Sequence, residues 1–105
     1  KLNPYNVEAR VARGQFFTDP KNNPNYQAAV VDFTKAYELA SSQEDVIYGV
    51  ALCQYHLNKP AKALVTINRA LQRNISFKAG YALRALIYSR LNRPKDAERD
   101  RKKAK

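Results

Sequence analysis

The sequence has few of the residues that build reactive or covalently stabilised sites. Its 105 residues include one cysteine and one histidine, with no tryptophan and no methionine. A single cysteine excludes an internal disulfide and any metal site made of several cysteines. One histidine leaves little room for histidine-based catalysis. Only three glycines and five scattered prolines occur, which excludes collagen-like and low-complexity chains.

Long apolar runs are also missing. No run approaches the roughly 18 residues that span a bilayer, and the opening KLNPYNVEAR has neither an initiator methionine nor an apolar stretch typical of signal peptides. We therefore expect no membrane span and a chain cut from something longer, and we leave the compartment open between cytoplasm and bacterial periplasm. With 45% apolar and 27% charged residues, the chain has the composition of one small folded domain or a short repeat array.

Acidic residues are scarce in one half only. Residues 58–105 hold fourteen basic and three acidic side chains, whereas residues 1–57 hold five basic and six acidic ones. The net charge of +10 therefore belongs to the second half. A local excess of this kind favours acidic partners: an acidic protein, nucleic acid, anionic lipid or polysaccharide.

Two stretches of the second half repeat one another at a fixed spacing. The string LNKPAKA at 57–63 returns as LNRPKDA at 91–97, so that each residue lies 34 positions after its equivalent. The same spacing relates Ala51 to Ala85 and Ala70 to Ala104. A fixed period of this length is the sequence signature of stacked helical repeats.

The repeated unit is predicted to be a pair of antiparallel helices. Apolar residues recur every three or four positions over 45–57 and again over 61–73, as in amphipathic helices. Between them, Asn58 suits a left-handed helix end, and Pro60 suits the first turn of the next helix. Ser42 and Asp45 have the spacing of a capping box at the start of the first helix. So short a turn makes the two helices antiparallel neighbours.

The first third of the chain fits the same unit with a longer turn. Helices are predicted over 7–17 and 25–40, and Asp19-Pro20-Lys21-Asn22-Asn23-Pro24 between them has the composition of a loop. This turn is three residues longer than its counterpart in the second copy. The predicted domain covers 1–105, with repeats at about 7–43, 44–77 and 78–105. The last helix offers only Ala97 and Ala104 to a core.

The distribution of small residues resembles the tetratricopeptide repeat (TPR) family, whose unit is 34 residues long. Small residues stand at equivalent places of all three copies: Gly14, Ala51 and Ala85, then Ala29, Ala63 and Ala97, then Ala36, Ala70 and Ala104. The segment LNPYNVEAR at 2–10 is similar to the junction between repeats of the family. The resemblance implies an all-α fold: an α-solenoid of three antiparallel helix pairs in a right-handed superhelix. The repeat register predicts a three-repeat fragment of a longer TPR-containing protein.

The resemblance also implies a groove, lined by the first helix of each pair, that binds partner segments. Its places are filled here by Val11 and Gln15, then Tyr48, Leu52, Tyr55 and His56, then Leu86 and Arg90. The two tyrosines would anchor an apolar or extended segment, and Arg90 would pair with a carboxylate. The alternative for the tyrosines is packing against an adjacent helix of a longer array.

One use of the family can be tested on the sequence. Repeats that grip the acidic C-terminus of cytosolic chaperones do so with lysine, asparagine and arginine side chains. The equivalent places hold Val11, Gln15, Gly49, Ala79 and Leu83, and none of these is positively charged. A chaperone-tail binder is therefore disfavoured.

Cys53 and His56 lie three residues apart on one predicted helix. They are either a thiol nucleophile with its base or a buried small apolar residue beside a groove-lining histidine. No orienting partner or glycine-rich loop accompanies them, so we favour the second interpretation. We expect no catalytic residue, no metal, no cofactor and no small-molecule substrate.

The basic excess gathers on the second helices and the C-terminal tail, at Lys62, Arg69, Arg73, Arg99, Lys102 and Lys103. This is either a solvated outer face or a docking surface for an acidic protein or a polyanion. We predict a non-catalytic scaffold that binds a peptide or partner segment in its groove. The alternatives are a basic module, residues 58–105, that binds nucleic acid or an anionic envelope polymer, and an architectural spacer within a longer array. The oligomeric state is left open.

Overall fold

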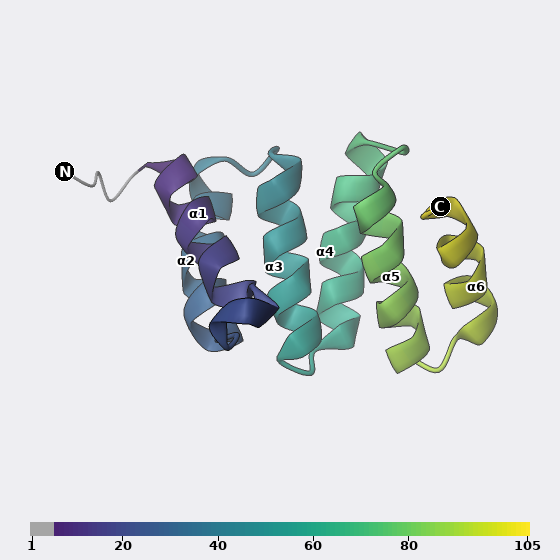
Figure 1. Cartoon of the computed structure of the whole chain (residues 1–105). Helices are drawn as coiled ribbons and strands as arrows, with labels where there is room; N and C mark the ends of the chain where they lie inside the picture. Colours follow the sequence, from purple (N-terminus) through teal and green to yellow (C-terminus); the bar gives the residue numbers. More distant parts are fainter. Residues whose placement is uncertain (1–5) are drawn as a thin grey trace.

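The computed structural model describes residues 6–105, and along them six α-helices follow one another in three antiparallel pairs (Figure 1). The pairs are α1 (Val7–Thr18) with α2 (Tyr26–Leu39), α3 (Glu44–His56) with α4 (Pro60–Arg73), and α5 (Lys78–Arg90) with α6 (Pro94–Lys103). No strand occurs over 6–105. The predicted all-α fold of helix pairs is confirmed.

The pairs are stacked in chain order. Figure 1 shows them one after another, with α1 and α2 at one end of the array and α6 at the other, and the array measures 48 × 28 × 22 Å. Besides its neighbours along the chain, α3 packs against both α1 and α5, whereas in the described part of the chain the backbones of α2 and α4, and those of α4 and α6, do not approach one another closely, and α2 reaches α4 through the side chains of Tyr37 and Arg69. The array is therefore tighter on the first-helix side. The right-handed winding of a longer superhelix stays a prediction.

Small residues allow the helices of each pair to approach closely. Ala29, Ala51, Ala63, Ala70 and Ala97 are all fully buried. Larger side chains fill the remaining space in two core clusters, one centred on Phe33 and the other on Ile47 and Ile67. Because α3 contributes to both clusters, the core runs through the array from pair to pair.

The short turns have the conformation that the sequence predicts. Asn58 and Asn92 are left-handed, with φ of 64° and 62°, and Pro60 and Pro94 begin the next helices, where a missing N–H costs nothing. The capping box predicted from Ser42 and Asp45 is wrong. The N-cap of α3 is Gln43, no side chain caps this helix, and Asp45 lies inside its first turn.

The long turn of the first pair differs in part from the loop predicted over 19–24. Pro20–Asn22 form a short 3-10 helix, η1, because the Asp19 side chain accepts a hydrogen bond from the Lys21 backbone N–H at 2.9 Å. Asn23, with φ of 59°, ends it. The inter-repeat junction predicted at 2–10 lies outside the described residues over its first four positions.

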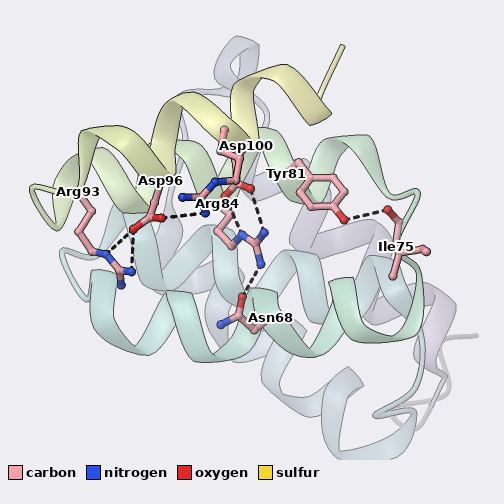
Figure 2. A network of polar contacts seen from close by, with 8 residues as sticks. Asn68, Ile75, Tyr81, Arg84, Arg93, Asp96 and Asp100 are labelled. Atoms are coloured by element: carbon pink, nitrogen blue, oxygen red, sulfur yellow. Dashed lines mark hydrogen bonds and ion pairs between the residues drawn. The ribbon is translucent and has the colours of Figure 1, made fainter.

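The last helix contributes more to the interior than its two alanines. Asp100 is 2% exposed and accepts two hydrogen bonds from the guanidinium of Arg84 on α5 (Figure 2). The expectation that only Ala97 and Ala104 face the core is therefore wrong. Asp100 was overlooked because a carboxylate lies inside a protein only when it is paired, and its partner lies on another helix.

Candidate functional site

A groove of about 220 Å³ opens between the first helices of the three pairs. Gln15 and Thr18 of α1 form one side and Ala79 of α5 the opposite one. Between them lies α3, which presents Tyr48 and Leu52. Because these two residues are one helical turn apart, they lie on the same face of α3. The groove is thus assembled from all three pairs.

Tyr48 is the aromatic wall of this groove. Its ring packs against the core cluster around Ile47 and meets the Phe77 ring edge to face, with 5.7 Å between centroids and 70° between planes. Burial raises the pKa of the Tyr48 hydroxyl, which stays neutral and able to donate a hydrogen bond. The wall is held in place by packing before any ligand arrives.

Phe33 of α2 forms the floor. Its ring reaches between Gly14 of α1 and Gly49 of α3, and a Cβ at either position would overlap the ring atoms. Because residue 49 is a glycine, the Phe33 ring of α2 can reach the groove between the first helices of the pairs, α1, α3 and α5. The floor and the α3 wall are both apolar or aromatic.

The charge at the groove is acidic. Glu44 and Asp45, in the first turn of α3, are lining residues, and no lysine or arginine is among the residues that line it. Glu44 is held in position because its Oε2 accepts a hydrogen bond from Asn74 Nδ2 at 2.6 Å. The acidic end of the groove thus favours a ligand with a positive or neutral group beside its apolar part.

Three of the predicted groove residues form a separate aromatic row at the far ends of α3 and α5. His56 stacks on Tyr26 with 4.0 Å between ring centroids and meets Tyr55 edge to face at 5.0 Å. The guanidinium of Arg90 lies 4.7 Å from the Tyr55 ring centroid. Although His56 is exposed, partial desolvation lowers its pKa, and the positive charge of Arg90 lowers it further. This row links residues of all three pairs.

Two other residues predicted for the groove, Val11 and Leu86, do not line it. Leu86 is half exposed but does not line the hollow. Val11 is only 6% exposed and packs in the core cluster around Phe33, so its placement in the groove is wrong. The reason is register: Val11 lies three residues before Gly14, and this helical spacing puts both on the face that meets Phe33. Arg90 has no carboxylate partner among residues 6–105.

Cys53 does not have the environment of a nucleophile. It is fully buried, and burial raises the pKa of its thiol to about 12, so the reactive thiolate is suppressed. The His56 ring stacks on Tyr26 and meets Tyr55 edge to face instead. Within residues 6–105, no cluster of three or more histidine, cysteine or acidic side chains is placed to hold a metal ion. No described helix is long and apolar enough to cross a membrane.

The predicted basic residues are all exposed, but they differ in their partners. Arg99 Nη1 pairs with Asp96 at 2.9 Å, and Lys103 Nζ lies 5.4 Å from the Tyr81 ring centroid. Arg69 Nη1 donates to the Tyr37 hydroxyl at 2.7 Å. Lys62 and Arg73 have no side-chain partner in the described part of the chain, whereas the charge of Lys102, after the larger effect of Arg101, helps to lower the pKa of Glu98. The charge of α6 is thus partly neutralised by its own acids, and that of α4 is not.

Sequence reasoning missed Phe33 and Phe77 as groove residues. Phe33 has the spacing of a core residue, and only the two glycines facing it reveal that its ring reaches the groove. Phe77 stands 34 positions after Gln43, in a polar turn where a large apolar side chain is unexpected. That difference between equivalent positions was a usable signal.

No protein-family model matches the sequence, and no curated protein matches it. Solved structures do share the fold. The first TPR domain of the human RPAP3 protein is similar with a TM-score of 0.83 and 20% identity, over 97% of this chain and 78% of that one. The first TPR of Spaghetti (RPAP3), bound to the HSP90 peptide SRMEEVD, is similar with a TM-score of 0.82 and 20% identity, over 98% and 79% of the two chains.

A crystal structure of MamA is similar with a TM-score of 0.80 and 22% identity, and the match covers 98% of this chain and 58% of MamA. At such identities the likeness concerns the fold. The chain has the fold of TPR domains.

Proposed function

We propose that this chain is a non-catalytic interaction module that holds an extended segment of a partner protein in the groove between α1, α3 and α5. The observation that carries the proposal is the apolar hollow whose walls come from all three pairs, with Tyr48 and Leu52 at its centre. A ready-formed aromatic surface costs little ordering on binding and contributes large contact area, which is why tyrosines anchor many interfaces.

The groove favours a partner segment with an apolar residue next to a neutral or basic one. The apolar residue would pack between Tyr48 and Leu52 over the Phe33 ring. A lysine, arginine or N-terminal amine beside it would face Glu44 and Asp45. An acidic segment would meet like charge at this end.

The solved relatives support the general mode and differ in the charge. The Spaghetti domain of the same fold was solved with an HSP90 peptide that contains two consecutive glutamates. The lining of the present groove offers no basic side chain to such a sequence. The shared fold supports peptide binding, and the residues support a different peptide.

The experiment is a selection from a random heptapeptide library displayed on phage, followed by fluorescence polarisation of the selected peptides with the chain. We expect peptides with an aromatic or large aliphatic residue next to lysine or arginine. Leu52→Ala should weaken their binding by about tenfold or more, the usual cost of losing an interface anchor. SRMEEVD should bind at least tenfold more weakly than the selected peptides.

A matched control is Val65→Ala on α4, since Val65 is 57% exposed and lies away from the groove. It should leave peptide binding unchanged. Selection of acidic peptides, or equal losses in Leu52→Ala and Val65→Ala with both variants folded, would contradict the proposal. Binding that disappears by about 0.3 M salt and ignores Leu52→Ala would instead support polyanion binding through residues 58–105.

A further inference from the structure

We propose that a second hollow, on the second-helix side of the array, binds a phosphate group carried by a segment of a partner protein. This hollow has a volume of about 230 Å³. Tyr37 and Ser41, at the end of α2 and just after it, form one wall, and Arg69, Gln72 and Arg73 of α4 form the other. It shares no residue with the groove between the first helices.

Two guanidinium groups face this hollow. Arg69 and Arg73 are four residues apart on α4, and this spacing puts them on one face about 6 Å apart along the helix axis. Arg69 Nη1 donates a hydrogen bond to Tyr37 Oη at 2.7 Å, which fixes the guanidinium at the edge of the hollow. Tyr37 is itself held by packing against both core clusters. The site is therefore partly preorganised.

The Tyr37 hydroxyl is also available to a ligand. Its oxygen accepts the hydrogen bond from Arg69, so its own hydrogen is free for an acceptor in the hollow. The Ser41 hydroxyl and the Gln72 amide add neutral donors on either side. The hollow thus combines two guanidinium groups with several neutral hydrogen-bond donors.

The charge of these arginines is not compensated within the described chain. Four of the five other arginines of residues 58–105 meet carboxylates: Arg84 meets Asp100, Arg93 and Arg99 meet Asp96, and Arg101 meets Glu98. Arg69, by contrast, bonds only to a neutral hydroxyl, and Arg73 has no side-chain partner among residues 6–105. Like charges one helical turn apart destabilise a helix. An anion between them would remove that cost.

A phosphate monoester fits this donor set better than a carboxylate. A phosphate monoester has three terminal oxygens and close to two negative charges near neutral pH, and arginine guanidinium groups bind it through bidentate hydrogen bonds. Two guanidinium groups and two hydroxyls can serve all three oxygens, whereas a carboxylate would leave donors unused. Tyr37 is the one aromatic side chain among the described residues that line the hollow, so its lining does not offer the series of stacking rings that a nucleic-acid strand uses.

The test uses the 105-residue chain and a glycine-serine heptapeptide with one central phosphoserine. Nitrogen-15 NMR should show saturable shifts of the Arg69 and Arg73 side-chain Nε–Hε resonances. The unphosphorylated peptide, and the same peptide with glutamate in place of phosphoserine, should bind at least about tenfold more weakly than the phosphopeptide. The double variant R69Q/R73Q should lose at least about tenfold in affinity, and Tyr37→Phe should lose severalfold with both arginines retained.

The matched control is R99Q/R101Q, which removes the same charge from α6, and it should bind the phosphopeptide within about twofold of the parent chain. All substituted arginines are exposed, so thermal melts should show folded variants. The proposal is overturned by equal losses in the two double variants, by shifts that never saturate, or by glutamate-peptide binding of equal strength. Tighter binding of a single-stranded oligonucleotide or of anionic vesicles, reduced equally in both double variants, would also overturn it.

Discussion

Arg84 and Asp100 are joined by two parallel hydrogen bonds between α5 and α6, from Nε to Oδ2 at 2.7 Å and from Nη2 to Oδ1 at 2.9 Å (Figure 2). The third guanidinium nitrogen, Nη1, donates to Asn68 Oδ1 on α4 at 2.8 Å. One side chain therefore links the third helix pair internally and also to the second pair. Hydrogen bonds between two charged partners are the strong ones in proteins.

The first pair contains the same contact. Arg13 donates from Nε and Nη2 to Asp32 at 2.8 and 2.7 Å. The partners are 19 residues apart here and 16 apart in the third pair, and the difference matches the three extra residues of the first turn. The register of the repeat thus fixes a polar contact as well as the apolar ones.

In the second helix pair, other residues stand in place of the arginine and the aspartate. Val50 and Thr66 stand 34 positions before Arg84 and Asp100. Thr66 Oγ1 hydrogen-bonds instead with Gln54 Oε1 at 2.7 Å and with the Lys62 carbonyl at 3.1 Å. An arginine at position 50 or an aspartate at position 66 alone would lack its counter-charge, which is costly at a buried site, and neither residue is present in the second pair.

We expect Asp100→Asn to lower the free energy of unfolding by about 2–3 kcal/mol. The substitution removes a buried negative charge and leaves the mostly buried Arg84 guanidinium without its counter-charge. Urea unfolding followed by circular dichroism measures the change. The control is Asp96→Asn, because the pairs of Asp96 with Arg93 and Arg99 are far more exposed and should be worth less than about 1 kcal/mol. Equal effects of the two substitutions would contradict this assignment.

Asp32 should make stability depend on pH in the acid range. The hydrogen bond from Arg13 lowers the pKa of Asp32 below its ordinary value of 3.8, against the opposing effect of burial. The unfolded chain therefore takes up this proton at higher pH than the folded chain does. The stabilisation is present above about 3.8 and is lost as the pH falls through the depressed value.

The measurement is the free energy of unfolding in urea at several pH values between about 5 and 2. Asp32→Asn should flatten the dependence below about pH 4. Asp45→Asn removes the same charge from an exposed site with no side-chain partner in the described chain, and it should leave most of the slope. A slope that is unchanged in Asp32→Asn would show that Arg13 does not hold the carboxylate ionised.

The sequence predicted the helices and their pairing because those depend on local patterns. The spacing of Ala51, Ala63 and Ala70, together with Asn58 and Pro60, was enough to place α3, its turn and α4. The 34-residue period then extended that result along the chain. Capping was less predictable, since the N-cap of α3 is Gln43, which makes no side-chain hydrogen bond to the helix, and not the predicted Ser42.

The sequence predicted several side chains that line the groove, but not the aromatic ring that forms its floor. Gln15, Tyr48 and Leu52 were expected there from the resemblance to TPR domains, and all three line the groove between the first helices. The Phe33 floor depends on how far one helix layer reaches through the other, which no local pattern records. The hollow at Arg69 and Arg73 needs Tyr37, 32 residues earlier in the chain, and the contact arises only when the second pair stacks on the first.

Gly49→Ala should destabilise the fold although alanine is the better helix former. The new Cβ would overlap the Phe33 ring, which is 2% exposed and cannot easily move. Overpacking of this kind costs about 1–3 kcal/mol, more than the roughly 1 kcal/mol of helix propensity gained. Urea unfolding should show a net loss that is partly recovered in the double variant G49A/F33L. A more stable Gly49→Ala protein would show that the ring has room to shift.

The sole histidine offers a direct measurement of the aromatic row. Partial desolvation against Tyr26, and secondly the charge of Arg90, lower the pKa of His56 below its ordinary 6.5. The unfolded chain then binds the proton more readily, so this contribution to stability is present above about 6.5 and is lost as the pH falls through the depressed value. The row should thus loosen on mild acidification.

Proton NMR of the His56 Hε1 resonance gives the pKa without assignment, because the chain has one histidine. Arg90→Gln should move the pKa upward towards 6.5, since it removes the neighbouring positive charge. Arg93→Gln is the control: it deletes the same charge from a residue whose guanidinium lies over Tyr88 and pairs with Asp96, and it should leave the titration in place. A pKa at or above 6.5 in the parent chain would mean that the stack on Tyr26 favours the imidazolium, and the predicted loosening would then reverse.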